Sequence, residues 1–453
     1  MRIRRKISMK KAASRLSIAA LAALASSCAS YEAAPIDLPA ETDAWRERSA
    51  EAAGTRAELS FADAKTIGLI FSPELNRARA QLAKSRDVEK ESGWWEDPSL
   101  SLSVKRVLDT GAQPWAYSPG FALTVPVTGL PALAEEAAAH YAEADFWTLA
   151  QAETDFSEAL AETWTDYAVA EKKREIIDAY LKKLLEEKTR LEKLCAAGEV
   201  SAAELQKEND RFNATAGEKR DVEMTLAALR AEIAQKIGLA PETAAALKFS
   251  AELPQDVPAP VPSPTAEQLA ALPKIRASLA AYDASETALK TEIRRQYPEL
   301  SLSPSYEVDG NDEFADSLTL GVGFSLPLWN RNRLGIATAK GDREIARTET
   351  LLLWRDQFHA LRRLEREQEI AQTHCRAQAE RSRGFAERTK RIYAEIDAGE
   401  TSPAALSEAA QQNFSAALDY WDALGDYLKA RIRILAMTVE SAPPETTAAA
   451  RER

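Results

Sequence analysis

The sequence contains few of the residues that most often carry chemistry in proteins. Its 453 residues include three cysteines, three histidines and four methionines. His140, His359 and His374 are too far apart in the sequence to form a metal-binding motif, and four methionines cannot supply a ladder of soft ligands for copper. The sequence also has no nucleophile elbow, phosphate-binding loop or paired-cysteine metal motif. These absences argue against an enzyme and predict neither a cofactor nor a bound metal.

Long apolar segments are missing as well. Beyond the N-terminal region, no stretch reaches the ~20 apolar residues that a transmembrane helix requires, so this chain could cross a membrane only with strands. The formal net charge of -12 argues against nucleic acid as a partner. Cys195 and Cys375 do not occupy equivalent positions of the repeat described below, and we interpret both as packed thiols.

The first 28 residues have the order of a bacterial secretory signal. Basic residues come first, an apolar run from Leu16 to Ala25 follows, and small residues lead to Cys28. The segment that ends in Ser26-Ser27-Cys28 is similar to a lipoprotein signal, in which Cys28 becomes the lipidated first residue. A plain signal peptide is the alternative, because Ala25 stands where Leu is usual. Ala29 follows the cysteine, which favours the outer membrane over the inner one.

Residues 58–249 are repeated about 200 positions later, over residues 265–440. Asp97-Pro98-Ser99-Leu100 corresponds to Tyr297-Pro298-Glu299-Leu300, and Ala197-Gly198-Glu199-Val200-Ser201 corresponds to Ala398-Gly399-Glu400-Thr401-Ser402. Landmarks that keep one offset along the chain indicate a duplicated architecture. A proline-rich linker, residues 250–264, joins the copies. Residues 29–57 and 441–453 are interpreted as tails without hydrophobic periodicity.

Each copy is predicted to contain a helix, two strands, a long helix, a tight turn and a returning helix. The first helix is expected over residues 59–91 and over residues 265–295. Large apolar and small residues then alternate, as is typical of strands. The clearest alternation involves Leu318, Leu320, Val322, Phe324, Leu326 and Leu328, and weaker ones begin near residues 99, 121 and 300. The fold class is therefore mainly α with a small β part.

Helical patterns of about 67 residues follow the strands, from Pro131 to Ala197 and from Arg331 to Ala398. At 1.5 Å per residue, such a helix is about 100 Å long. A spacing of seven indicates coiled-coil packing and involves Ala170, Ile177, Leu184 and Leu191. Gly198 and Gly399 are expected to end the long helices, and Ser201 and Ser402 to cap the returning ones.

Four strands per chain cannot close a barrel, and an open sheet edge is not tolerated in lipid. A dimer would supply eight strands, and side chains fill the interior of a barrel of that size. A trimer would supply twelve, enough for a water-filled lumen. Trp94, Trp95, Trp115 and Trp329 lie beside strand segments, as an aromatic girdle at the membrane interface would require. Packing between strands and helices is the alternative for these four residues.

Together these features resemble the TolC-type outer membrane efflux proteins. The resemblance covers residues 58–440 and rests on the Cys28 signal, the duplication, the Pro-x-Leu-x-Leu strand starts, Pro126 and Pro327, and the Gly-x-x-Ser turns. It implies a homotrimer with a twelve-stranded β-barrel in outer membrane lipid, continued by an α-helical barrel through the periplasm. It also implies a passive conduit of a tripartite efflux system, with a periplasmic adaptor protein and an inner-membrane pump of the RND type as partners.

The resemblance also assigns roles to particular residues. Gly198, Ser201, Gly399 and Ser402 would lie at the periplasmic tip, where the family meets its adaptor. Glu204 and Glu408 are candidates for acidic side chains that narrow the pore, and solvated helix positions are the alternative. Ala405 occupies the position equivalent to Glu204, which weakens the match.

Two further interpretations stay open at this level. The segment from Leu326 to Gly335 resembles a signature of the heavy-metal efflux branch, with a polar turn between strand and helix as the alternative. The alternative function is a periplasmic coiled-coil adaptor or scaffold without a barrel, although such proteins usually carry only one helical hairpin.

Overall fold

The computed structural model describes residues 31–106, 115–309, 317–397 and 403–438. The chain divides into two units, with the boundary after Glu51. Most of helix α2 (Leu38–Ala53) belongs to the first unit. The interpretation of residues 29–57 as a tail is therefore wrong for this helix. Polar residues surround α2 on all sides, so hydrophobic periodicity could not reveal it.

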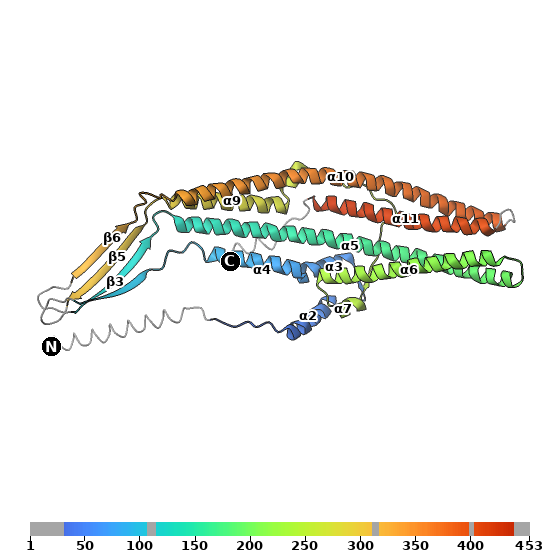
Figure 1. Cartoon of the computed structure of the whole chain (residues 1–453), viewed down its shortest axis with the longest axis horizontal. Coiled ribbons are helices and arrows are strands. Elements are labelled where there is room, and N and C mark those ends of the chain that lie inside the picture. Colours follow the sequence, from blue (N-terminus) through green and yellow to red (C-terminus); the bar gives the residue numbers. More distant parts are fainter. Residues whose placement is uncertain (1–30, 107–114, 310–316, 398–402, 439–453) are drawn as a thin grey trace. The chain divides into compact units, whose positions relative to one another are not determined.

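The second unit contains the remaining described elements (Figure 1). Its helices are α3 (Phe61–Phe71), α4 (Pro73–Lys90), α5 (Leu130–Ala196), α6 (Ala202–Ile237), α7 (Pro241–Ala246), α8 (Ala266–Ala270), α9 (Pro273–Arg294), α10 (Arg333–Asp397) and α11 (Pro403–Ala436). Its strands are β1 (Glu58–Leu59), β2 (Ser99–Arg106), β3 (Trp115–Val125), β4 (Lys248–Phe249), β5 (Leu300–Asp309) and β6 (Ser317–Phe324). The prediction of a mainly α fold with a small β part is confirmed.

The first helix of each predicted repeat is broken in two, which corrects the prediction of continuous helices over residues 59–91 and 265–295. Each break comes directly before a proline, between α3 and α4 at Ser72-Pro73 and between α8 and α9 at Leu272-Pro273. Proline disfavours the helical conformation in the residue before it. Ser72 and Leu272 accordingly have ψ angles of 126° and 136°.

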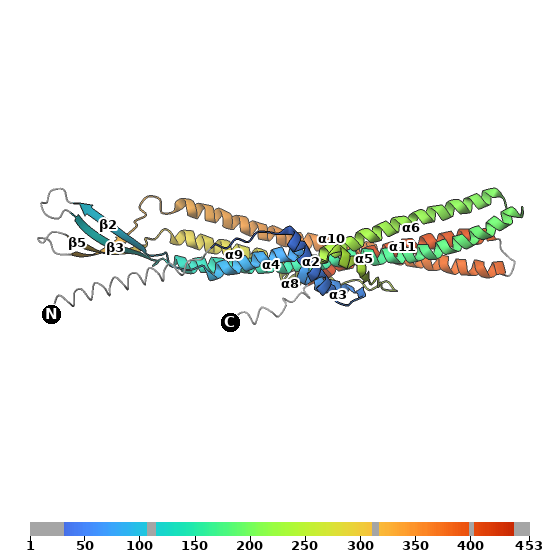
Figure 2. The same ribbon diagram turned by 90° about the horizontal axis from the view of Figure 1, so that it is seen from below.

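Helices α5 and α10, of 67 and 65 residues, organise the bundle. Helix α5 packs against α4 and α9 on the side of the sheet and against α6 and α11 on the side of the hairpin turns (Figure 2). Helix α10 packs against α9 and then α11. Ala170, Ile177 and Leu184 are buried, so the coiled-coil seam expected from their spacing is confirmed.

Strands β2, β3, β5 and β6 form an antiparallel sheet in the order β2-β3-β5-β6, with β2 and β6 at its edges. Strand β3 ends before Pro126, and β6 ends three residues before Pro327. Leu326 and Leu328 therefore lie outside the sheet, contrary to the prediction from their alternation. A proline has no backbone N–H for a sheet ladder, so it favours the end of a strand.

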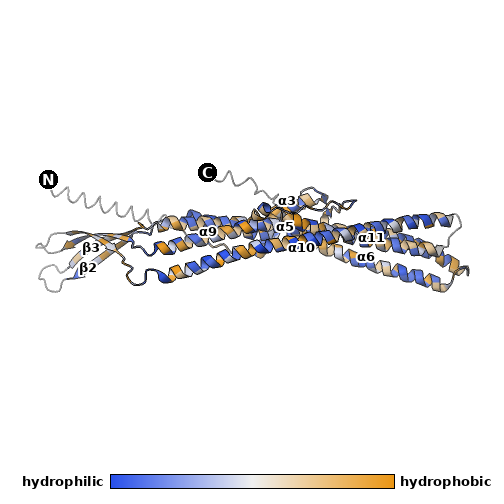
Figure 3. Ribbon diagram, turned by 90° about the horizontal axis from the view of Figure 1, so that it is seen from above, coloured by the Kyte–Doolittle hydropathy of each residue, from blue (hydrophilic) through white to orange (hydrophobic). Residues whose placement is uncertain are grey.

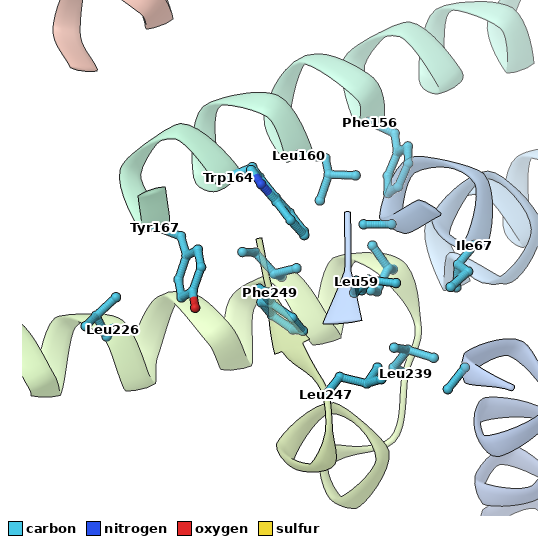
Figure 4. Close-up of a cluster of buried hydrophobic side chains, with 14 of the residues drawn as sticks. Leu59, Ile67, Phe156, Leu160, Trp164, Tyr167, Leu226, Leu239, Leu247 and Phe249 are labelled. Atoms are coloured by element: carbon cyan, nitrogen blue, oxygen red, sulfur yellow. The ribbon is translucent and has the colours of Figure 1, made fainter. Parts of the chain in front are cut away.

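A second, very small sheet anchors the middle of the bundle and was not predicted. Strands β1 and β4 pair in parallel, with Leu59 opposite Phe249. Trp164 of α5 stacks on Phe249 at a centroid distance of 5.5 Å, and its Nε1 donates a hydrogen bond to the carbonyl oxygen of Ser250 (Figure 4). The cluster in Figure 4 joins segments nearly 200 residues apart in the sequence to α5.

The proline-rich linker, residues 250–264, has no regular structure but is fixed to α10. The Gln368 side chain accepts a hydrogen bond from the Val261 amide at 2.9 Å and donates one to the Val261 carbonyl at 3.1 Å. Both residues are buried. The amide side chain thus satisfies a buried backbone donor and acceptor at once.

Two glycines in the left-handed conformation allow a matched stability test. Gly238 has a φ of 79°, and a Cβ atom at this position would lie 2.5 Å from the Phe71 carbonyl oxygen. Gly198 has a φ of 76° with open space around it. Gly198→Ala should therefore lower the free energy of unfolding by about 1–2 kcal/mol, the strain of alanine in the left-handed conformation. Gly238→Ala should lower the free energy of unfolding by about 1–3 kcal/mol more, because the backbone at Phe71 must also shift to accommodate the Cβ atom.

Thermal unfolding of the two purified variants checks this prediction. The melting temperature of Gly238→Ala should fall further than that of Gly198→Ala. Equal losses would contradict the close contact between the end of α6 and Phe71.

Candidate functional site

The strands of the four-stranded sheet contain both hydrophilic and hydrophobic residues (Figure 3), and the register divides these residues between two chemically different faces. Register and alternation place small or hydroxylated residues on one face, which we call the small face. Its members are Ser99, Ser101, Ser103, Lys105, Ala116, Ser118, Gly120, Ala122, Thr124, Ser301, Ser303, Ser305, Glu307, Asp309, Ser317, Thr319, Gly321 and Gly323. The opposite, apolar face is exposed, with Leu100 at 82%, Leu318 at 78% and Leu320 at 67% of their accessible surface. A monomer in water would not leave such a face uncovered.

The small face is closely packed where glycine stands opposite serine. Gly321 pairs with Ser303, and Gly323 pairs with Ser301. A Cβ atom at Gly120 would lie 2.8 Å from the Ser101 hydroxyl oxygen, which instead donates to the Gly120 carbonyl at 3.4 Å. Because these side chains are small, the small face has little side-chain bulk and is polar. Gly321 and Gly323 thus lie on the small face of β6, opposite serines of β5.

The tryptophans named from the sequence are all exposed in the single chain. Trp94 and Trp329 have 75% and 86% of their surface accessible, and Trp95 and Trp115 are also exposed. Trp94, Trp95 and Trp329 flank the end of the sheet that joins the helices, whereas Trp115 begins β3 at the opposite end. Arg106 lies over the Trp115 ring at 5.5 Å. The packed-junction interpretation therefore does not hold for Trp94, Trp95 and Trp329 in the single chain.

The first helical hairpin turns as predicted. Gly198 follows the end of α5, and its amide donates to the Cys195 carbonyl at 3.0 Å. Ser201 is the N-cap of α6: its hydroxyl accepts from the Glu204 amide, and the Glu204 carboxylate accepts from the Ser201 amide at 3.2 Å. The predicted cap is confirmed and is a reciprocal capping box. Gly399 and Ser402 lie outside the described residues, as does Cys28.

The two acidic residues proposed for the pore are both exposed, on different helices. The Glu204 carboxylate is held by the capping box, and Glu408 accepts a hydrogen bond from Gln412 Nε2 at 3.3 Å. Neither contact favours a pore position over a solvated one. The role of Glu204 and Glu408 stays a prediction.

A buried polar cluster near the hairpin turns was missed from the sequence. Arg211 of α6 pairs with the buried Glu208 at 3.0 Å and donates to Ser407 of α11. Desolvation raises the pKa of Glu208, with Arg211 opposing the shift. Nearby, Tyr180 of α5 stacks on Phe414 at 4.2 Å, and burial raises the pKa of Tyr180 to about 12. These contacts link the α5/α6 hairpin to α11, and no local pattern could reveal contacts between segments so far apart in the sequence.

The segment from Leu326 to Gly335 forms a turn between β6 and α10. Arg331 and Asn332 both have positive φ angles, of 45° and 50°. Asn332 Nδ2 donates to the Glu292 carbonyl at 2.8 Å and to its carboxylate at 2.6 Å. A Cβ atom at Gly335 would collide with that carboxylate. The asparagine and glycine of the signature-like segment therefore fix the turn onto α9, as the polar-turn interpretation expected.

Cysteines, histidines and acids offer no reactive constellation among the described residues. Cys375 is fully buried, and burial raises the pKa of its thiol to about 11, whereas Cys195 is half-buried. Within the described ranges, no group of three or more His, Cys, Asp or Glu is placed to hold a metal ion. In the same ranges, no helix is long and apolar enough to span a membrane.

One open pocket of about 780 Å³ lies beside the β1/β4 pair. Apolar residues of α5 and α11 line it, together with Glu58, Asp63, Glu252 and Arg431. Asp63 is engaged by the Ser60 hydroxyl in the cap of α3, which lowers the pKa of its carboxyl. The lining contains neither His nor Cys, and its Ser60 hydroxyl donates to the Asp63 carboxylate at 2.6 Å as part of the helix cap.

Comparison with solved structures identifies the fold, although no family model and no curated protein matches the sequence. The chain superposes on CusC, studied for its folding and transmembrane channel formation, with a TM-score of 0.70 and 14% identity over 83% of this chain and 92% of that chain. The outer membrane protein VceC from Vibrio cholerae gives a TM-score of 0.69 and 16% identity over 83% and 95% of the chains. The outer membrane channel CmeC of Campylobacter jejuni gives 0.72 and 13% over 86% and 88%. This chain has the fold of these outer membrane proteins.

The turn between β6 and α10 supplies a second matched pair of variants. Asn332→Ala should lower the free energy of unfolding by about 2–4 kcal/mol, because it removes a hydrogen bond to a carboxylate and one to a carbonyl. Arg331→Gly should leave stability unchanged or raise it, because glycine adopts a positive φ without strain. Thermal unfolding of both variants checks the prediction. If Asn332→Ala were neutral, the turn would not depend on this contact.

Proposed function

We propose that this protein is the outer membrane channel of a tripartite efflux system, a passive conduit from the periplasm to the exterior. The observation that carries the proposal is the four-stranded sheet, which has an exposed apolar face, a small polar face and two unpaired edges. Strands β3 and β5 have 11 and 10 residues, close to the ~9–11 that a membrane-spanning strand requires. The apolar face would contact lipid, and the small face would line a lumen of water.

The edges of the sheet and of the helical layer support a closed ring of chains. Strand β2 and helices α4 and α6 form one edge, and strand β6 and helix α10 form the other. These edges differ, so copies would associate head to tail, which closes into a ring when the rotation is correct. Three copies supply twelve strands. Exposed apolar residues lie on both helical edges: Val88 and Met224 on one, and Ile345, Leu352 and Ile370 on the other.

The duplication and the partners belong to the same proposal. Both predicted repeats contain a proline-broken helix, two strands, a long helix and a returning helix. An adaptor or scaffold does not require two strand pairs with an exposed apolar face, so the channel is the better account. The partners would be a periplasmic adaptor at the hairpin turns, including Gly198, Ser201, Gly399 and Ser402, and an inner-membrane RND-type pump that supplies the energy.

Lipidation at Cys28 and export of heavy-metal cations are finer parts of the proposal. The lipoprotein-like signal supports Cys28, and loss of lipid labelling in Cys28→Ser would test it. The signature-like segment from Leu326 to Gly335 supports the heavy-metal branch. Asn332 and Gly335 have structural roles, so we assign them no contact with cargo. Sensitivity of a deletion strain to metal salts, compared with its sensitivity to drugs, tests the cargo.

Two adjacent residues on opposite faces of β6 test the membrane position of the sheet. Leu320→Lys places a charge on the apolar face, where a mid-bilayer lysine costs about 2–4 kcal/mol per chain. Thr319→Lys places the same charge on the small face, where water would solvate it. Leu320→Lys should therefore reduce the amount of folded protein in the outer membrane fraction, and Thr319→Lys should not. Equal amounts of folded protein for the two variants would contradict the proposed orientation of the sheet.

Glu204 and Glu408 are proposed to narrow the periplasmic mouth. Six carboxylates in a trimer would form a ring that attracts cations. Glu204→Gln with Glu408→Gln should raise the resting conductance or reduce cation selectivity in planar bilayers, while assembly stays normal. Since Gln can keep the capping contact of Glu204, a change in conductance would report the lost charge. Unchanged conductance and selectivity would place both residues on a solvated outer surface.

A further inference from the structure

Charge is confined to one end of the four-stranded sheet. Among residues within β2, β3, β5 and β6, the charged ones are Lys105, Arg106, Glu307 and Asp309. All four lie at the end of the sheet away from the helices, where β2 and β5 end. The remaining positions of the small face carry only hydroxyl groups, methyl groups or hydrogen as side chains.

Lys105 and Glu307 meet across an intervening strand. They belong to β2 and β5, which flank β3 and are therefore about 10 Å apart. Lys105 Nζ nevertheless lies 3.8 Å from Glu307 Oε1. The contact is diagonal: on β3, Ala116 is the cross-strand partner of Lys105 and is only 2% exposed, and on β5 the partner of Ala116 is Asp309, two residues beyond Glu307. A small residue on β3 thus lets two long side chains bridge the small face.

Arg106 lies next to Lys105 in sequence but on the other face. It pairs with Trp115 across the strands, and its guanidinium lies over the Trp115 ring. Its row on β2 continues through Val104, Leu102 and Leu100, the exposed apolar residues. Two adjacent cationic residues therefore have different surroundings. One faces the small side with a carboxylate partner, and the other faces the apolar side with an aromatic partner.

We propose that Lys105 and Glu307 set the charge selectivity of the outer mouth of the conduit. The inference rests on the proposed function, because only a closed ring gives the small face a lumen. In a ring of three chains, three Lys105–Glu307 pairs would form a charged band on the small face, near the end of the sheet that lies away from the helices. Removal of one partner leaves three like charges around the lumen, and rings of like charge select ions.

The test measures the electrostatic potential at the mouth with a cysteine probe. Ser103→Cys places a thiol on the small face two residues before Lys105, in a background with Cys195→Ala and Cys375→Ala. Intact cells or proteoliposomes are treated with two thiosulfonate reagents of similar size, one carrying an ammonium and one a sulfonate. The readout is the ratio of their reaction rates. This ratio does not depend on whether the periplasmic end is closed, because the reagents enter from outside.

Opposite shifts are expected from the two single substitutions. Lys105→Gln should raise the cation-to-anion rate ratio about threefold or more, and Glu307→Gln should lower it by a similar factor, as expected for charges within about 10 Å in water-like surroundings. The double variant, and the exchanged pair Lys105→Glu with Glu307→Lys, should return close to the parent ratio. Arg106→Gln removes the same charge from the other face and should leave the ratio unchanged.

The outcomes separate this inference from the proposed function. If Ser103→Cys reacts and Leu102→Cys is protected, the small face lines an aqueous lumen, and the ratios then decide the inference. The inference is overturned if the rate ratio is unchanged by Lys105→Gln and by Glu307→Gln. It is also overturned if Arg106→Gln changes the ratio as much as Lys105→Gln does. If instead Leu102→Cys reacts and Ser103→Cys does not, the proposed conduit itself fails.

Discussion

The unpaired backbone groups along β2 and β6 are the constraint on which the rest of this architecture depends. In lipid, each unsatisfied N–H or C=O costs several kcal/mol, so a four-stranded sheet with two open edges cannot remain alone there. The exposed leucines of the apolar face are equally unsuited to water. The proposed ring would satisfy both requirements, because β6 of each chain would pair with β2 of the next and the apolar face would meet lipid.

The long helices continue the two edges of each chain away from the sheet. Helix α4 leads into edge strand β2, and edge strand β6 leads into α10, so the helices connected to the edge strands also lie at the edges of the helical layer. The turn at Asn332 fixes the direction of α10 on α9, and the β1/β4 pair fixes α5 near its middle. These two anchors would keep neighbouring chains parallel over helices of about 100 Å. A conduit requires such rigidity more than it requires any reactive side chain.

Features set by local chemistry could be predicted from the sequence. The alternation around Leu320 identified a strand, the spacing of Ile177 and Leu184 identified a buried seam, and Gly198 with Ser201 identified a turn and a cap. The breaks before Pro73 and Pro273 were missed, although proline disfavours the helical conformation of the preceding residue. Contacts between distant segments were not predictable, because Leu59 with Phe249 and Arg211 with Ser407 have no shared periodicity. The Lys105–Glu307 pair likewise required the sheet order to be known.

If chains close a ring through their unlike edges, the mass of the particle must equal a whole ring. Native mass determination of the protein extracted in mild detergent from the outer membrane should give three chains per particle, with no stable smaller species. A particle of one or two chains that remains folded and inserted in bilayers would contradict the account, because it would leave edges of the sheet open or the lumen filled.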